Sequence, residues 1–354
     1  MYEYSHGGNA AFENGNEIIM DLSANINPLG MPKNVRNAII REIKNCNRYP
    51  DNFSTGLREK IANFENVKTD WVFCGNGTSD IIFRLPKTIQ TNKMMFATPA
   101  FQDYERSARS SDAEIVRYNL YPENGFALDS DFIEAVRREK PGLIFICNPN
   151  NPTGKITETG LIGELLDASR QTGALVVVDE CFMDFVEQSN EYTSKIFLEK
   201  YSNLVILKAF TKLFALPGIR LGYALCADKT RIDSLYFHGA DWPVSNLAQA
   251  AGIAALEEAE NYIKQTAAYV AAERIAIEKE LDRLGYKIFE ACANYVFLQN
   301  PHPFDLCTEL DKKGIRIRSC KNFPGLDGSY YRIAVSKKEY NARLLTTIAE
   351  LTQL

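Results

Sequence analysis

Short apolar runs alternate with helical patterns over the first two thirds of the chain. Most of these runs are apolar at successive positions, so both faces of the resulting strands are expected to be buried. Such strands, separated by helices, are typical of a mostly parallel sheet covered on both sides. We therefore predict an α/β fold with strands at residues 71–74, 94–97, 114–118, 143–147, 174–179, 204–207 and 221–226. The first helix between them is expected at 78–90, with Thr78 as its N-cap.

The pattern changes after Ser245. An alanine-rich helical region extends to about Leu284 and is followed by mixed strands and helices, the pattern of a smaller α+β domain. The expected strands are 295–298, 314–318 and 331–335.

The beginning of the chain, residues 1–48, is predicted to be irregular. Its glycines and asparagines suit backbone conformations that wrap closely around other segments. We expect an N-terminal arm (1–45) that joins the small domain, a large domain (46–240) and a small C-terminal domain (241–354).

Composition narrows the class of protein. With 45% hydrophobic and 24% charged residues, the 354-residue chain can bury a large core, and its net charge of −5 predicts no nucleic-acid partner. No apolar run approaches the roughly 18 to 20 residues of a membrane span, and the first residues do not resemble a signal peptide, so a cytoplasmic location is expected. Eight cysteines without a Cys-x-x-Cys pair, and only three histidines, predict neither a disulfide framework nor a metal site.

One stretch carries the strongest chemical signal. Lys212 lies in a mostly apolar run that leads into Pro217-Gly218, and Arg220 follows eight residues after the lysine. Burial favours a neutral amine, which can attack a carbonyl and form a Schiff base. A nearby arginine suits a phosphate. The alternative is a solvated lysine at the end of a strand.

Other segments of the first domain suit a phosphorylated aromatic cofactor. Gly75-Asn-Gly77-Thr-Ser79 joins a strand to a helix and can offer free N–H groups to a phosphate, although it can also be a simple turn. Asp179 ends an apolar strand, where its carboxylate can pair with a ring nitrogen or cap the next turn. Asn151 lies in a loop made rigid by Pro149 and Pro152, and Phe101 can stack on a ring or pack in the core.

Together these segments resemble the fold-type-I pyridoxal-phosphate (PLP) enzymes over nearly the whole chain. Asn148-Pro-Asn-Asn-Pro-Thr-Gly154, Val178-Asp-Glu180 and the Thr211-Lys212 to Tyr223 run occur in the family's order and spacing. The resemblance implies a mostly parallel, seven-stranded sheet between helices, with a smaller α+β domain. It also implies a cofactor site in which Lys212 is the Schiff-base lysine and Asp179 lies at the pyridine nitrogen. Asn151 would lie near the ring hydroxyl and Phe101 on the ring face. The phosphate would be bound by Arg220, Thr211 and the backbone amides of Gly77, Thr78 and Ser79.

The same resemblance implies a homodimer, in which Tyr49 reaches the phosphate from the neighbouring subunit. Arg332 matches the arginine that binds the substrate carboxylate. The substrate is expected to be a small phosphorylated amino acid, bound by His6, Gly7, Asn25, Asn151, Arg318 and Arg332. Arg316 and Arg318 alternate along one expected strand, and a solvated strand face is the alternative for both.

Two branches of the family compete, the threonine-phosphate decarboxylases and the histidinol-phosphate aminotransferases. Segments 6–9, 21–30 and 242–252 look like the decarboxylase branch. So does Phe182, because the aminotransferases usually carry a tyrosine there. The resemblance therefore implies decarboxylation of L-threonine O-3-phosphate in corrinoid synthesis, with serine phosphate as another possible substrate. One alternative is a histidinol-phosphate aminotransferase of histidine synthesis. The other is a regulatory protein that binds PLP without turnover.

One departure from the family pattern lies beside the lysine. Lys208-Ala209 occupy positions where family members commonly have arginine followed by threonine or serine. Ala209 lacks the hydroxyl that often supports the cofactor phosphate, so weaker cofactor binding is expected unless Gly77 and Ser79 compensate.

Overall fold

The apolar runs between residues 72 and 225 form one seven-stranded sheet. A computed structural model describes residues 7–353, apart from 9–11, 14–15 and 90. The strand order is β4-β10-β9-β8-β7-β5-β6, and only β10 runs antiparallel to its neighbours. This confirms the predicted mostly parallel sheet. The strands are β4 (Val72–Gly75), β5 (Lys93–Thr98), β6 (Glu114–Asn119), β7 (Leu143–Cys147), β8 (Leu175–Asp179), β9 (Leu204–Ala209) and β10 (Gly222–Leu225).

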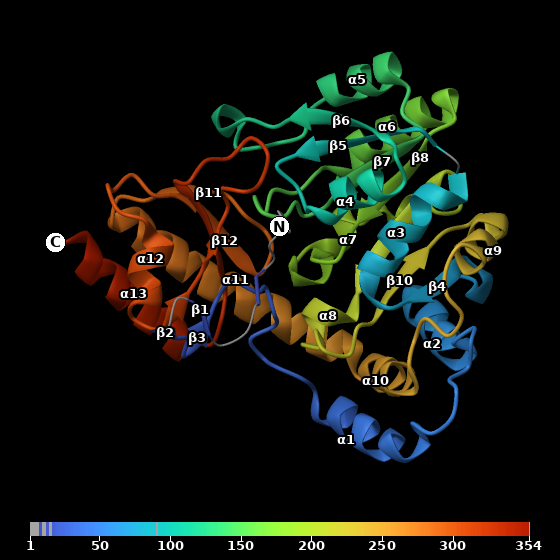
Figure 1. Ribbon diagram of the computed structural model, residues 1–354, viewed down its shortest axis with the longest axis horizontal. Helices are drawn as coiled ribbons and strands as arrows, with labels where there is room; N and C mark the ends of the chain where they lie inside the picture. The colour runs from blue at the N-terminus through green and yellow to red at the C-terminus, as the bar shows by residue number, and fades with distance from the viewer. Residues whose placement is uncertain (1–6, 9–11, 14–15, 90, 354) are drawn as a thin grey trace.

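Helices cover both faces of this sheet, as the apolar strands require (Figure 1). One face packs against α3 (Gly77–Ile89), α4 (Asp103–Ser110) and α9 (Lys229–Phe237). The opposite face packs against α2 (Thr55–Glu65), α5 (Asp131–Glu139), α6 (Thr159–Thr172) and α10 (Asn246–Glu257). The shorter elements of this part are η2 (Thr69–Trp71), η3 (Pro122–Asn124), η4 (Met183–Phe185), α7 (Ser189–Tyr192), η5 (Ser194–Phe197) and α8 (Phe210–Leu213).

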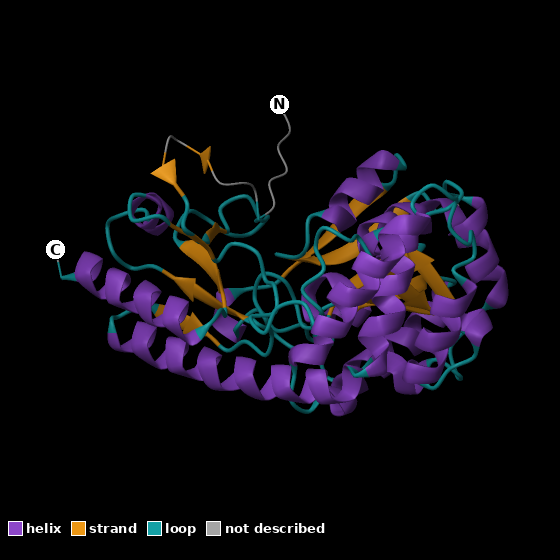
Figure 2. Ribbon diagram, turned by 90° about the horizontal axis from the view of Figure 1, so that it is seen from below, coloured by secondary structure: helices purple, strands orange, loops and turns teal. Residues whose placement is uncertain are grey.

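A second, smaller sheet forms the other side of the molecule (Figure 2). Its order is β11-β12-β15-β14, all antiparallel. Helices pack on it and share a core that includes Val296, Leu298 and Ile333. The elements of this part are α11 (Ala259–Arg283), β11 (Lys287–Phe289), β12 (Tyr295–Gln299), α12 (Leu306–Asp311), β13 (Ile315–Arg316), β14 (Arg318–Ser319), β15 (Tyr330–Ala334) and α13 (Lys338–Thr352).

The described part of residues 1–48 contains more regular structure than predicted. They contain β1 (Phe12–Glu13), β2 (Asn16–Glu17), β3 (Met20–Asp21), α1 (Lys33–Glu42) and η1 (Ile43–Asn45). The prediction of an irregular segment was wrong at α1, which buries Val35 and Ala38 in the core beside α10. Strand β3 pairs in parallel with β13, so the arm is joined to the smaller part.

Two predicted segments divide differently. The strand expected at 314–318 is two strands in two sheets, because β13 pairs with β3 whereas β14 pairs with β15. The alanine-rich region is two helices, and α10 packs in the core of the large sheet. Helix α3 begins at Gly77, so Thr78 lies in its first turn rather than at the cap. The domain limits at 45/46 and 240/241 stay predictions.

None of the helices in the described part of the chain is both long and apolar enough to cross a membrane.

Candidate active site

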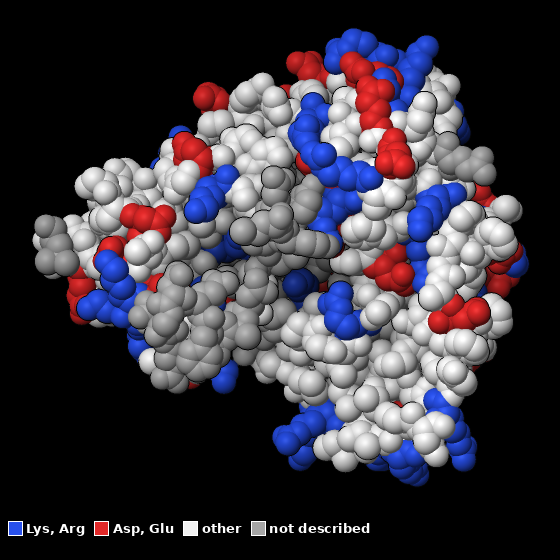
Figure 3. Space-filling model, in the orientation of Figure 1, with Lys and Arg blue, Asp and Glu red and all other residues white. Residues whose placement is uncertain are grey.

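A pocket of about 390 Å³ lies where the large sheet, the small sheet and the N-terminal arm meet. It opens at the carboxyl ends of the parallel strands, the usual ligand site of such sheets. Several basic side chains lie in and beside the central hollow in Figure 3. The pocket brings together twelve of the predicted residues: Gly7, Asn25, Thr78, Ser79, Phe101, Asn151, Asp179, Thr211, Lys212, Arg220, Arg318 and Arg332.

Lys212 is positioned by α8, the short helix that follows β9. The arm fixes this helix, since Asn27 donates its backbone N–H to the Lys212 carbonyl (3.1 Å) and its side-chain amide to the Leu213 carbonyl (2.7 Å). Burial lowers the pKa of the Lys212 amine to about 8, and the positive charges of Arg332 and Arg220 act in the same direction. Roughly a tenth of the amine is therefore neutral and nucleophilic at pH 7, far more than for an unperturbed lysine.

Asp179 ends β8 and points into the pocket. Its Oδ2 accepts a hydrogen bond from the Tyr104 hydroxyl (2.8 Å), and its Oδ1 accepts one from the Cys181 backbone N–H (3.1 Å). Burial raises the pKa of this carboxyl group, whereas both hydrogen bonds lower it. A carboxylate held in this way can pair with a protonated ring nitrogen.

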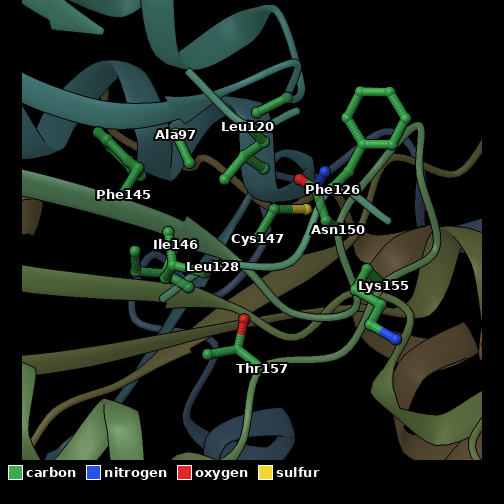
Figure 4. A pocket seen from close by; sticks show the side chains of 11 residues that line it. Ala97, Leu120, Phe126, Leu128, Phe145, Ile146, Cys147, Asn150, Lys155 and Thr157 are labelled. Atoms are coloured by element: carbon green, nitrogen blue, oxygen red, sulfur yellow. The ribbon is translucent and has the colours of Figure 1, made fainter. Parts of the chain in front are cut away.

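Two cysteines, Cys147 and Cys181, line the pocket together with Asp179. Burial raises the pKa of the Cys147 thiol to about 12 and that of Cys181 well above its usual value, and the negative charge of Asp179 adds to both shifts. Cys147 also lines a separate cavity of about 20 Å³, whose other lining residues include Phe126 and Asn150 (Figure 4). Both thiols therefore remain protonated at neutral pH and are poor nucleophiles.

The turn between β4 and α3 forms one end of the pocket. Gly77 has φ +75°, and a Cβ atom built on it would lie 2.6 Å from Nη2 of Arg220. Thr78 and Ser79 follow in the first turn of α3 and line the pocket beside this guanidinium. Backbone N–H groups at a helix start, together with an arginine, form a favourable site for a phosphate.

Arg318 and Arg332 lie opposite each other on β14 and β15. Arg332 is buried, donates to Asn151 Oδ1 and to the Ser23 carbonyl (2.7 Å), and its Nε has no partner among the described residues. Arg318 donates to Asn322 Oδ1 (2.8 Å). The two cations make this side of the pocket suitable for an anionic ligand.

Arg316 and Arg318 belong to strands of different sheets, since β13 pairs with β3 and β14 pairs with β15. Arg316 is buried and pairs with Asp311 (3.6 Å), whereas Arg318 lines the pocket. The alternative of a solvated strand face is therefore wrong for Arg316, whereas Arg318 is half-buried.

The arm closes the remaining side. Gly8 donates its N–H to Ser23 Oγ (2.9 Å), and a Cβ atom on Gly7 would collide with the Ser23 carbonyl oxygen. Asn25 is buried beside them, and its Oδ1 has no partner among the described residues. The close backbone contact explains why a glycine is needed at position 7.

Comparison with known proteins identifies the family. Residues 17–348 match the family "Aminotransferase class I and II". The chain belongs to this family. It is 32% identical to a threonine-phosphate decarboxylase from Salmonella typhimurium, over 98% of this chain and 96% of that protein. It is 31% identical to a histidinol-phosphate aminotransferase from Methanococcus aeolicus, over 96% of this chain and 91% of that protein.

The fold agrees with this assignment. The histidinol-phosphate aminotransferase from Clostridium acetobutylicum superposes with a TM-score of 0.88 at 29% identity, covering 95% of this chain and 99% of that one. Class I and II aminotransferases depend on PLP, so the predicted cofactor and fold type are confirmed. The two relatives are almost equally similar to this chain, and their identities therefore do not distinguish decarboxylation from transamination.

The residues of the pocket fit PLP. The unpartnered polar atoms of Asn25 and Arg332 are buried, as expected where a polar ligand binds. The low-pKa amine of Lys212 would bind the aldehyde, and Asp179 would face the pyridine nitrogen. The turn at Gly77 and the guanidinium of Arg220 would hold the phosphate.

The departure at Lys208-Ala209 has a structural explanation. Lys208 is buried and forms ion pairs with Asp184 (3.0 Å) and Glu65 (3.5 Å), so it contributes to the core. Successive side chains of β9 point in opposite directions, and Ala209 lines the pocket. The hydroxyl of Ser79, the residue expected to compensate for Ala209, donates a hydrogen bond to Asp103 Oδ2 (2.7 Å). Weaker cofactor binding through Ala209 stays a prediction.

Three predicted residues are not among those that line the pocket. Gly77 lies directly behind Arg220. Tyr49 is 79% exposed, and its ring stacks on Trp242 with centroids 4.4 Å apart. His6 lies outside the described residues, so its role stays a prediction.

Several residues that line the pocket were not predicted from the sequence. Ser23, Gln102, Asp103 and Cys181 each lie within two positions of a predicted residue in the chain and could have been inferred from it. Phe323 comes from a loop of the smaller part, and its sequence carries no comparable signal.

Proposed function

We propose that the protein decarboxylates L-threonine O-3-phosphate to (R)-1-amino-2-propanol O-2-phosphate, for the nucleotide loop of a cobalamin-type corrinoid. The Cα–carboxylate bond breaks, CO₂ leaves and a proton is added at Cα. We further propose that the enzyme is a cytoplasmic homodimer. Similarity to a threonine-phosphate decarboxylase over 98% of the chain supports this proposal.

The pair of arginines supports a phosphorylated amino acid as the substrate. Threonine phosphate carries a carboxylate and a phosphate on either side of its amine. In our proposal Arg332 binds the carboxylate and Arg318 binds the phosphate or shares the carboxylate, while His6, Gly7, Asn25 and Asn151 complete the substrate site. Two cations in one pocket are favourable for a substrate with two anionic groups.

Phe182 is the observation that carries the choice of reaction. It lines the pocket and packs edge-on against Tyr295, with ring centroids 5.3 Å apart. The aminotransferase branch usually has a tyrosine at this position, whose hydroxyl contacts the ring oxygen of the cofactor. Phe182 cannot donate that hydrogen bond, which favours the decarboxylase branch.

When bound, PLP supplies an electron sink for whichever Cα bond lies perpendicular to its ring. The chain's task is therefore to orient the substrate and to exclude water. Arg332 and Arg318 would fix the orientation of the carboxylate, and the arm residues Gly7 and Ser23 cover the site. The Lys212 amine would deliver the proton to Cα, for which a pKa of about 8 is well suited.

Histidinol-phosphate aminotransferase is the second candidate. The 31% identity to the Methanococcus aeolicus enzyme and the TM-score of 0.88 to the Clostridium acetobutylicum enzyme favour it. In that reaction Arg332 would bind the carboxylate of the amino donor, because histidinol phosphate has none.

Separate incubations test the proposal. The purified protein with PLP is given threonine phosphate, or glutamate with imidazole-acetol phosphate, and the products are identified. We expect CO₂ and aminopropanol phosphate from the first mixture and at most slow amino transfer in the second. Lys212→Ala is expected to abolish turnover, which would also exclude a regulator without catalysis. Amino transfer without CO₂ release would contradict the proposal.

A further inference from the structure

Tyr104 lies in the first turn of α4, behind the wall of the pocket. It is fully buried, and its ring stacks on Phe145 with centroids 4.7 Å apart and planes 10° apart. Its ring also meets the edge of Phe101, the predicted stacking partner of the cofactor, at 5.7 Å. These contacts fix the orientation of the ring, and the Tyr104 hydroxyl donates a hydrogen bond to Asp179 Oδ2 (2.8 Å).

The Asp179 carboxylate depends on its hydrogen bonds. Its burial, together with the negative charge of Asp103, raises its pKa and favours the neutral acid. The Tyr104 hydroxyl donates to one oxygen and the Cys181 N–H to the other, and both bonds favour the ionised form. Because these donors engage different oxygens, they also fix the rotation of the carboxylate about its Cβ–Cγ bond.

We propose that Tyr104 is a positioning residue, whose hydroxyl keeps the Asp179 carboxylate ionised and turned toward the cofactor's pyridine nitrogen. This inference rests on the proposed role of Asp179 as partner of that nitrogen, and it is independent of which Cα bond the enzyme breaks. Asp179 controls the charge of the ring, and Tyr104 acts through it. Stacking on Phe145 alone would be satisfied by phenylalanine, whereas orienting a buried carboxylate requires the hydroxyl.

Cofactor binding by the apoprotein separates this role from a structural one. We would measure dissociation constants for PLP and for 1-deazapyridoxal 5′-phosphate, which keeps the aldehyde and phosphate but lacks the ring nitrogen. The ratio of the two constants, which we call the preference for PLP, reports only on the ring nitrogen. Tyr104→Phe keeps the stacked ring and removes the hydroxyl. We expect it to lower the preference for PLP by about tenfold, the typical effect of one hydrogen bond to a charged group.

Two further variants make the result decisive. Tyr295→Phe is the matched control, because Tyr295 is also a buried tyrosine at the site but donates to the Asn150 carbonyl (2.7 Å). It should leave the preference for PLP unchanged. Asp179→Asn should lower the preference at least as much as Tyr104→Phe.

The outcomes distinguish the two assignments. If Asp179→Asn lowers the preference but Tyr104→Phe leaves it at the wild-type value, the proposal for Tyr104 is wrong and the role of Asp179 stands. If Asp179→Asn has no effect, both assignments fail. If Tyr104→Phe folds poorly because the buried Asp179 carboxylate has lost a hydrogen bond, the double variant Tyr104→Phe/Asp179→Asn replaces that carboxylate with a neutral amide. Its preference must then equal that of Asp179→Asn alone, and a further loss would overturn the proposal.

Discussion

Lys212 shows how the surroundings of one side chain create its chemistry. The amine lies in the pocket wall beside two guanidinium groups, those of Arg220 and Arg332. Desolvation and positive charge both favour the neutral form, whereas Asp179 opposes them. The balance gives an amine that can act both as a nucleophile and as a proton donor near neutral pH.

The pH dependence of cofactor capture by the apoprotein should reflect this balance. Only the neutral amine attacks the aldehyde, so the rate should rise with pH and reach half its maximum near pH 8, instead of near 10.5. Stopped-flow absorbance with PLP measures the rate, and Lys212→Arg should remove the covalent phase. A midpoint above pH 10 would show that the amine is not perturbed.

Site residues were predictable from the sequence where their chemistry depends on local patterns. Lys212, Asp179 and Asn151 each follow or end a recognisable strand, and the structure gathers them in one pocket. Tyr104 was not predicted as part of the site. Its importance depends on a hydrogen bond to a residue 75 positions away, which no local pattern contains.

The β4–α3 turn places a strict requirement on the backbone at Gly77. Gly77 combines a positive φ with close contact to Arg220, so a side chain there would strain the backbone and displace the guanidinium. A helix start can bind a phosphate only if its N–H groups remain accessible. The glycine therefore links the local fold to the proposed phosphate site.

Gly77→Ala should separate these two effects. Like Gly173→Ala, it places alanine at a positive φ, and both should lower the free energy of unfolding by about 1 to 2 kcal/mol. Gly77→Ala should also weaken PLP binding by about tenfold or more, because the added Cβ would displace the Arg220 guanidinium. Gly173→Ala should leave PLP binding unchanged, because nothing lies within 4 Å of a Cβ atom there. Denaturant unfolding and fluorescence titration measure the two quantities. Equal PLP affinity in both variants would argue against a phosphate site at this turn.

Secondary structure was predictable where hydrophobic periodicity was strong. The buried strands β7 and β8 lie where their apolar runs predicted them. Helix α1 was missed because its buried residues are few and its sequence is mostly polar. The division of 314–318 into two strands depends on β3, almost 300 residues earlier in the chain, and on β15, so pairing rather than local sequence decides it.

The pocket is assembled from three distant parts of the chain. The large sheet supplies Lys212 and Asp179, the small sheet supplies Arg332, and the arm supplies Asn25. The exposed Tyr49 belongs to none of these walls. Its proposed role therefore requires a second copy of the chain, with Tyr49 reaching the neighbouring pocket.

Subunit complementation tests this arrangement. Tyr49→Ala and Lys212→Ala should each have low activity alone, since each lacks one part of the site. Co-expression should restore about a quarter of the wild-type activity, because half of randomly formed dimers are mixed and each has one intact site. Activity that stays at the level of the separate variants would show that Tyr49 does not act across an interface.

The fate of the substrate carboxylate distinguishes decarboxylation from amino transfer. L-Threonine O-3-phosphate labelled with ¹³C at the carboxylate, followed by ¹³C NMR with the PLP-loaded enzyme, tests it directly. We predict that all label from consumed substrate appears as CO₂ and bicarbonate, with aminopropanol phosphate formed in equal amount. Label retained in a three-carbon or longer organic product, with the amino group transferred to an oxo acid, would contradict the account.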